Sequence, residues 1–356
     1  MSKKGKIILA LSLLPQYFLI KVAKQYPDFM ETYYSMGVFP VLSKLLNTVF
    51  KWIPFSVGDL LYIALIVYVI RWGVINWKRL RTQPKAWGLD VLSFASLLYF
   101  MFHLCWGFNY YRVPLHTTLH LNPKYTTAQL KSVTNQLVKK TNRLHFAITQ
   151  DSLLKTTLPY AFSELTEISQ TGYSQLEKVY PNFKHDGKNS KKSLFSTPLT
   201  YMGFSGYVNP LTLEAHINAV MPLNSMPTTI AHEQAHQLGY AAENEANFIG
   251  FLASIYNKDP YFNYAGYKFA LRYCLIELSK RDPDVYASTL CAINPGVLED
   301  YREAFEFWSA YNNPLEPVFK GFYSHFLKAN NQSKGIESYS YVVALLVDYL
   351  EDYLED

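Results

Sequence analysis

Three long apolar runs dominate the first third of the chain. They cover about residues 7–23, 57–77 and 86–108, and each carries few charged residues. Because a helix of about 20 apolar residues crosses the hydrocarbon core of a bilayer, the pattern predicts three membrane-spanning helices. The first run also has the length of a signal peptide, but no small-residue cleavage site follows it. We therefore expect an uncleaved span.

A different pattern fills the stretch between the first two spans. Over about residues 37–54, apolar positions recur at helical spacing, with Lys44 and Lys51 between them. This arrangement favours an amphipathic helix that lies in the membrane interface. An ordinary helix packed on the globular part of the chain is the alternative.

Residues 109–356 are expected to form one globular domain. Helical periodicity marks 126–148 and 159–180,. Between Gly, Pro and Asn, the β-branched and aromatic residues of 195–220 are typical of short strands, and the remainder is helical. The predicted fold class is mainly α with a small β-sheet (α+β), in which a membrane domain of residues 1–108 precedes the globular domain.

Charge predicts how the chain is oriented in the membrane. Residues 1–107 hold 12 Lys and Arg against 4 Asp and Glu, whereas the rest of the chain holds 21 against 24. The basic loop of residues 78–85, between the second and third spans, is expected in the cytoplasm by the positive-inside rule. The globular domain would then be extracytoplasmic, on a bacterial inner membrane protein with several spans. Its mild acidity argues against nucleic acid as a partner.

The cysteines do not predict a disulfide framework. Of the three cysteines, only Cys274 and Cys291 share the globular domain, so one disulfide bond could form there and none is required,.

The sequence His232-Glu233-x-x-His236 predicts a metal site. Residues i and i+4 of a helix share one face, so both imidazoles can bind one ion, while Glu233 can reach water bound to that ion. This is the arrangement of a zinc hydrolase, with Glu233 as general base. A helix with two surface histidines is the alternative, but chance would give the motif only about once in a hundred such chains.

The limits of that helix also follow from the sequence. Thr228 or Thr229 offers an N-cap, and Gly239 offers a stop,. If the helix continued, residue 243 would lie about 10 Å from His236, too far to share an ion. The chain is therefore expected to turn at Gly239 and to return as a second helix that starts near Ala242.

Two acids on the second helix compete to be the third ligand. Glu243 and Glu245 would lie about 200° apart, so only one can face the metal. We favour Glu243, because Asn247 shares its face and could hold a metal-bound histidine by its second nitrogen. Glu245 is the alternative third ligand, or a supporting residue.

These residues resemble the zincin superfamily in its glutamate-ligand form, where HExxH is followed by a Glu-x-x-Ala-Asp helix. Glu243, Glu245, Ala246 and Asn247 match that pattern, with Asn in place of Asp. Over nearly its full length the chain also resembles an uncharacterised Bacteroidota-type family of membrane proteins with three spans and a gluzincin-like domain, through the segments 106–115, 203–218, 231–248 and 327–343. The resemblance implies a metallopeptidase fold and Zn²⁺, and it implies no substrate.

Two further groups of residues are candidates for substrate binding and catalysis. The segment 203–218 has the sequence position of the zincin edge strand that pairs with a peptide substrate; its Glu214 and His216 could touch substrate or support a ligand, although a structural role is more common. A group that stabilises the oxyanion is also needed. Tyr339 is the first candidate catalytic residue for this role, followed by His325 and Tyr301.

The leading functional interpretation is a membrane-anchored zinc metallohydrolase, a metalloendopeptidase that cleaves a polypeptide or a peptidoglycan peptide in the cell envelope. The expected partners are the lipid bilayer and this substrate. A zinc-binding membrane sensor or assembly factor with little turnover is the second interpretation. A scaffold that keeps the motif as a relic is the third. The sequence does not indicate an oligomeric state.

Overall fold

The chain forms two compact units. The computed structural model describes residues 1–185, 187, 190–332, 335 and 341–353. The N-terminal unit comprises Met1–Val113 and Asn209–Glu214, and the C-terminal unit comprises Pro114–Val208 and Ala215–Asp356. We expected a division after residue 108; the units divide after Val113, and the loop Asn209–Glu214 groups with the N-terminal unit.

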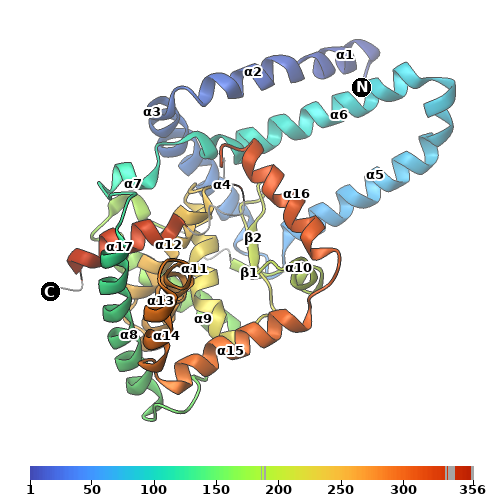
Figure 1. Cartoon of the computed structure of the whole chain (residues 1–356). Helices are drawn as coiled ribbons and strands as arrows, with labels where there is room; N and C mark the ends of the chain where they lie inside the picture. Colours follow the sequence, from blue (N-terminus) through green and yellow to red (C-terminus); the bar gives the residue numbers. More distant parts are fainter. Residues whose placement is uncertain (186, 188–189, 333–334, 336–340, 354–356) are drawn as a thin grey trace. The chain divides into compact units, whose positions relative to one another are not determined.

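The N-terminal unit is helical. Its elements are α1 (Lys3–Leu11), α2 (Leu13–Ala23), α3 (Pro27–Phe29), the π-helix η1 (Met30–Val38), α4 (Phe39–Phe50), α5 (Val57–Thr82), α6 (Pro84–Cys105) and the 3₁₀ helix η2 (Gly107–Tyr111). Helices α5 and α6 form a hairpin, and α1 and α2 run alongside α6 (Figure 1).

Three helical segments of this unit are long and apolar enough to cross a membrane. They are Lys3–Ala23, Val57–Thr82 and Pro84–Cys105. Most of their side chains are not covered by protein, as lipid-facing side chains would be. The predicted membrane-type organisation of this part of the chain is therefore confirmed.

Polar groups connect the apolar helices at defined points. The Asp90 carboxylate of α6 binds Lys6 of α1, and it accepts a hydrogen bond of 3.1 Å from Arg79 of α5. Further along, the Ser96 hydroxyl lies 3.1 Å from the Ser12 hydroxyl and accepts a bond of 3.0 Å from the Gln16 amide. The start of α1 and the hairpin end of α5 therefore lie at the same end of the unit.

The amphipathic segment predicted at 37–54 is a helix over a shorter range. It corresponds to α4, Phe39–Phe50, which continues from η1. Its location in a membrane interface stays a prediction.

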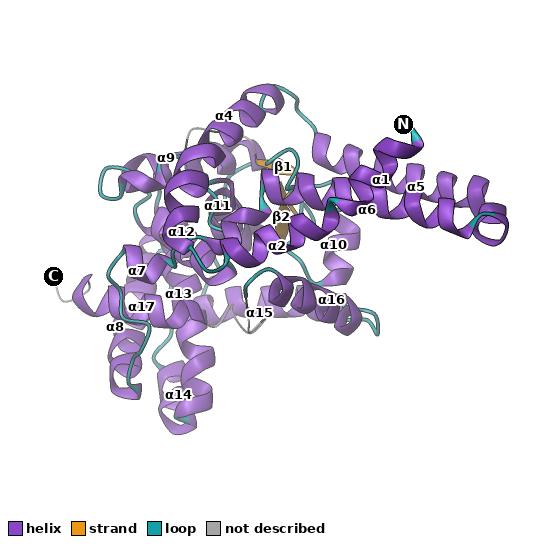
Figure 2. Ribbon diagram, turned by 90° about the horizontal axis from the view of Figure 1, so that it is seen from above, coloured by secondary structure: helices purple, strands orange, loops and turns teal. Residues whose placement is uncertain are grey.

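The C-terminal unit combines helices with one small sheet, which confirms the predicted fold class (Figure 2). Its elements are α7 (Leu115–Thr118), α8 (Thr127–Thr149), α9 (Phe162–Leu176), η3 (Pro181–Phe183), β1 (Ser190–Lys192), α10 (Ser196–Met202), β2 (Gly206–Val208), β3 (Ala215–Ile217), η4 (Leu223–Ser225), α11 (Met226–Gln237), α12 (Glu243–Ile255), α13 (Pro260–Arg281), α14 (Pro283–Cys291), α15 (Pro295–Ala310), α16 (Glu316–Ala329) and α17 (Val342–Tyr353).

Two local predictions for this unit were wrong. The beginning of the segment 195–220 is the helix α10 rather than a strand, and only β2 and β3 are extended. Helix α11 also begins earlier than Thr228 or Thr229, at Met226. Its first turn contains Pro227, which fits there because the first turn lacks intrahelical N–H partners,.

The sheet has the strand order β1-β3-β2, with β3 parallel to β1 and antiparallel to β2. The bonds Asn209 N–H to Glu214 O and Asn218 N–H to Ser205 O fix which residues of β2 face β3. The N–H and C=O groups of successive residues in a strand point to opposite edges. Since Ser205 and Asn209 bond towards β3, the backbone groups of Gly206 and Val208 point to the other edge of β2.

Helix α12 forms the centre of the core. All its residues from Glu245 to Ile255 are buried, and α8, α13 and α17 contribute apolar side chains to the same cluster. Burial on every side explains why this helix lacks a polar face. The three cysteines are free thiols, and Cys291 is exposed.

Candidate metal centre

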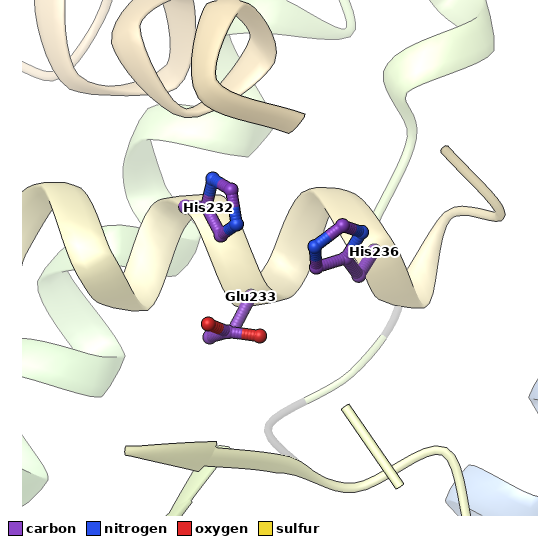
Figure 3. Close-up of side chains that lie close together, drawn as sticks. All are labelled: His232, Glu233 and His236. Carbon is purple, nitrogen blue, oxygen red and sulfur yellow. The ribbon is translucent and has the colours of Figure 1, made fainter. Parts of the chain in front are cut away.

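Helix α11 presents both histidines on one face. The ring centroids of His232 and His236 lie 4.7 Å apart, and one ligand atom from each of His232, Glu233 and His236 fits within 4.8 Å of the others. Figure 3 shows the two rings on the same side of the helix and the Glu233 carboxylate directed away from them, towards a strand. The predicted i, i+4 placement is therefore present.

The chain breaks after this helix as the sequence predicted. Helix α11 ends at Gln237, and Gly239 has a φ of 84°. Side chains with a Cβ rarely adopt this left-handed conformation, so glycine suits the turn. The Gly239 N–H donates to the His236 carbonyl at 2.8 Å. Ala242 is then the N-cap of α12, which returns towards α11.

The returning helix brings Glu243 to the histidines. Glu243 Oε2 lies 3.3 Å from His232 Nε2 and 3.6 Å from His236 Nε2. The two helices cross closely because α12 carries Gly250 at the crossing. A methyl group at Gly250 would stand 2.9 Å from the His232 backbone nitrogen. Without a side chain there, the helices can approach near enough for one carboxylate to face both rings.

The distances from Glu243 to the two histidines match the ligand spacing around a tetrahedral metal ion,. Ligands at about 2.0–2.1 Å from such an ion stand roughly 3.4 Å apart, close to the 3.3 Å and 3.6 Å between Glu243 and the histidines. Two imidazole nitrogens and one carboxylate oxygen are also a common donor set for Zn²⁺. The residues present therefore fit a zinc ion.

Backbone support orients one histidine. His236 Nδ1 lies 2.7 Å from the Tyr240 carbonyl oxygen, so Nδ1–H can donate to this carbonyl and Nε2 can face the ligand position. Asn247 was expected to have this role. No bond from Asn247 to either histidine occurs among the described residues, and its Nδ2 and His232 Nδ1 are buried there without hydrogen-bond partners.

Glu245 has a separate role. Its Oε1 accepts a hydrogen bond of 2.7 Å from the Leu115 N–H at the start of α7. The side chain thus fixes the entry of the chain into the C-terminal unit, while Glu243 lies with the histidines.

Glu233 faces the sheet. A methyl group at Gly206 of β2 would stand 2.7 Å from Glu233 Oε1. Glu233 Oε2 is buried and has no hydrogen-bond partner in the part of the chain that the structure describes. Burial raises the pKa of Glu233, although the histidines, His216 among them, oppose this effect. A buried carboxylate with an unsatisfied oxygen beside a candidate metal site is suited to exchanging a proton.

Glu243 and His236 shift the pKa of each other in opposite directions. Burial would raise the pKa of Glu243, but hydrogen bonds and charge from His232 and His236 hold it well below its usual range. Burial would likewise lower the pKa of His236, but the hydrogen bond and charge of Glu243 raise it to about 9. Without an ion, the carboxylate is therefore ionised and His236 retains a proton.

Two residues of this centre were missed by the sequence reasoning. The Tyr323 hydroxyl, from α16, donates to Glu243 Oε1, the oxygen opposite the one that faces the histidines. The Gln332 amide accepts a bond of 3.5 Å from the Glu243 N–H and donates one of 3.3 Å to the Ala241 carbonyl. Gln332 lies in the segment 327–343 that carried the family resemblance, and this was the only available signal.

Two of the three expected oxyanion groups, His325 and Tyr301, have other contacts. Tyr339 lies outside the described residues. His325 is exposed on α16, with its Nδ1 2.8 Å from the Gly321 carbonyl of the same helix. The Tyr301 hydroxyl donates to the Lys268 carbonyl. Both are occupied by local structural contacts.

The two candidates from the expected edge strand have different positions. Glu214 accepts hydrogen bonds of 3.2 Å and 2.5 Å from the N–H groups of Val57 and Gly58, within the N-terminal unit. It therefore caps the start of α5. His216 is buried on β3, and its ring centroid lies 4.7 Å from that of Tyr207. It opposes the rise in the pKa of Glu233 that burial causes.

Comparison with known proteins identifies the family. Neither the curated proteins nor the solved structures include a match to this chain. A family model described as "Protein of unknown function (DUF3810)" matches residues 34–347, which span most of both units and the whole candidate metal centre. The chain therefore belongs to the DUF3810 family.

Proposed function

We propose that this protein is a membrane-anchored, zinc-dependent metallohydrolase that cleaves peptide bonds. The observation that carries the proposal is the convergence of His232, His236 and Glu243 at metal-ligand spacing, with Glu233 buried beside them. An accidental pair of surface histidines would require neither the turn at Gly239 nor a buried acid that faces both rings.

The proposed zinc ion and Glu233 would have different roles in hydrolysis. When bound, zinc would acidify a water molecule and polarise the substrate carbonyl. Glu233 accepts the proton from the attacking water and later passes it to the leaving amine. Glu233 is buried beside the histidines, so its carboxylate is placed to take up this proton and to release it again.

The edge of β2 supports a peptide as the substrate. The backbone groups of Gly206 and Val208 point away from β3, and β2 lies against Glu233. An extended peptide could pair with these groups as an added strand, which would bring its carbonyl near the proposed base. A folded protein segment and a peptidoglycan peptide both offer such a backbone.

We also propose that the metal centre is outside the cytoplasm of a bacterial cell, in the inner membrane. Lys6 and Arg79 meet at Asp90, so the N-terminus and the basic α5–α6 loop lie at one end of the membrane helices. That end is expected in the cytoplasm. Three spans would then place the chain after α6 on the opposite side.

Metal analysis of the purified full-length protein tests the proposal. We expect about one zinc per chain in the wild type and its loss in His232→Ala and in Glu243→Gln, because three protein ligands are needed. The exposed His325→Ala is the control and should keep its zinc. Substoichiometric zinc that is unchanged by His232→Ala would refute the proposal.

Glu233→Gln separates a hydrolase from a zinc-binding sensor. The substitution keeps the metal ligands but removes the proton acceptor. A hydrolase loses turnover and cellular phenotype while retaining zinc, whereas a sensor keeps its phenotype. Envelope proteomics of cells with Glu233→Gln should show an accumulated substrate, which would distinguish a protein from a peptidoglycan peptide.

A further inference from the structure

Helix α16 carries an apolar stripe of exposed side chains. The stripe consists of Leu315, just before the helix, and Val318, Phe322 and Phe326 within it, which are 61%, 51%, 73% and 38% exposed. Steps of three and four residues place these side chains on one helix face. Large aromatic and aliphatic groups gathered on one exposed face mark an interaction surface more often than scattered ones do.

The rest of α16 is held in place by the C-terminal unit. Leu327 is fully buried, and Tyr323 donates to Glu243 at the metal centre. Both lie roughly 100–140° round the helix from Phe322. Phe326, at the edge of the stripe, stacks on Tyr323, whereas Leu315, Val318 and Phe322 point away from Tyr323 and Leu327. The exposure of these three side chains is not the result of a loosely attached helix.

A short segment joins the C-terminal unit to the last apolar helix. Only residues 106–113 separate the last residue of α6 from the first of the C-terminal unit. Fully extended, such a segment covers at most roughly 30 Å, and part of it is the helix η2. The C-terminal unit is therefore tethered close to a membrane, so that lipid is present at high effective concentration.

We propose that α16 is a membrane-surface helix, with its apolar stripe inserted at the boundary between lipid headgroups and acyl chains. The stripe offers only aliphatic and aromatic groups, which that boundary accepts without hydrogen bonds. Lys328 lies along one flank of the stripe and is exposed, where it can face the phosphate groups of the lipid headgroups. An amphipathic helix with a cation beside its apolar face is typical of interfacial binding.

This arrangement has a consequence for the metal centre. Tyr323 follows Phe322 directly, so membrane contact and the bond to Glu243 are made by adjacent residues of one helix. The metal centre would then open beside the membrane surface. If the proposed hydrolase activity holds, on which this last step rests, its substrates are polypeptide segments close to the bilayer.

Fluorescence quenching by lipid tests the location of α16 without any activity assay. In full-length protein with Cys291→Ser, Phe322→Cys is labelled with an environment-sensitive fluorophore, since Cys105 and Cys274 are buried. The protein is reconstituted in phosphatidylcholine nanodiscs that contain lipid with a nitroxide near its headgroup. Lys280→Cys on α13, whose side chain is 61% exposed, is the matched control.

The label at position 322 should show blue-shifted emission that the nitroxide lipid quenches, and the label at position 280 should show neither effect. Val318→Cys, on the same stripe, should repeat the result for position 322. Water-like, unquenched emission at both stripe positions would overturn the proposal. Labels shielded from aqueous iodide but not quenched by lipid would also overturn it, because protein, such as a second copy of the chain, would then cover the stripe.

Discussion

At the scale of single residues, the two oxygens of Glu243 have different partners. Oε2 faces the histidines, and Oε1 accepts the hydrogen bond of Tyr323. This arrangement fixes the rotation of the carboxylate before any ion binds. A preset ligand loses less conformational freedom on binding, so we expect the tyrosine to increase the affinity for the proposed zinc ion although it is not itself a proposed ligand.

Removing that hydroxyl should weaken metal binding. For Tyr323→Phe we expect zinc affinity to fall by about 10–100-fold, the usual cost of losing a group that orients a ligand. Competition with a chromophoric chelator measures the affinity. Tyr201→Phe, on the neighbouring helix α10, is the control and should bind zinc as the wild type does. Equal affinities in all three proteins would contradict the orienting role.

Zinc binding should also release a proton. In the metal-free protein the pKa of His236 is raised from 6.5 to about 9 by Glu243, against the opposite effect of burial. The protonated pair therefore stabilises the metal-free fold fully below pH 6.5, and this stabilisation is lost as the pH rises towards 9. Because zinc binds the neutral ring, its affinity should increase with pH up to about 9, roughly tenfold per unit for one proton.

Calorimetry in buffers with different ionisation enthalpies would measure this proton. At pH 7.5 the observed heat should depend on the buffer, and the dependence should disappear well above pH 9. Heat that is independent of the buffer at pH 7.5 would show that His236 is already neutral in the metal-free protein.

At the scale of elements, the close crossing of α11 and α12 determines whether the ligands meet. In Gly250→Ala, a methyl group would stand 2.9 Å and 3.0 Å from the backbone nitrogen and Cα of His232. These are backbone atoms, so the helices must move apart. Alanine favours a helix by about 1 kcal/mol over glycine, but we expect overpacking, at about 1–3 kcal/mol, to outweigh this gain.

Gly250→Ala should therefore lower both the thermal midpoint and the zinc affinity, because Glu243 moves with α12. Gly321→Ala on α16 is a matched control, since nothing lies within 4 Å of the added methyl group. That variant should be as stable as the wild type, or slightly more so. If Gly250→Ala is the more stable of the two, the helices do not need this close contact.

Local spacing explains which parts of the centre could be predicted from sequence. The i, i+4 histidines, the turn at Gly239 and the start of α12 all follow from helix geometry and glycine's freedom. The preference for Glu243 over Glu245 rested on Asn247 as a partner of a histidine. The structure brings Glu243 to the histidines without that contact among the described residues. Tyr323 is 80 residues from Glu243 in sequence. Patterns of local spacing carry no information about contacts between residues so far apart. The sequence therefore does not indicate which of the 29 tyrosines contacts Glu243.

The predictions for residues 196–202 and for Asn247 were wrong because contacts that sequence patterns do not reveal determined the structure there. Residues 196–202 are rich in β-branched and aromatic types but form α10, because tertiary packing overrides weak strand propensity in so short a segment,. The assignment of Asn247 to a histidine failed for another reason. His236 takes the Tyr240 carbonyl, which the turn after α11 brings within 2.7 Å. A backbone partner of this kind has no signature in side-chain patterns.

At the scale of the whole molecule, charge at one end of the membrane helices predicts topology. Lys78, Arg79, Arg81 and Lys85 surround the α5–α6 hairpin, and Lys6 reaches the same Asp90 as Arg79. Basic residues close to span ends remain in the cytoplasm. The three spans would then direct the C-terminal unit to the other side of the membrane.

Thiol labelling in spheroplasts tests this orientation with a cysteine that the protein already has. Cys291 is free and exposed in the C-terminal unit, so a membrane-impermeant maleimide should label it in intact spheroplasts. Thr82→Cys with Cys291→Ser places the thiol in the basic loop without changing its charge, and it should react only after lysis. The reverse result would put the metal centre in the cytoplasm. The proposed envelope substrates would then be wrong even if zinc binding and hydrolysis were both demonstrated, because a site on that side could not reach them.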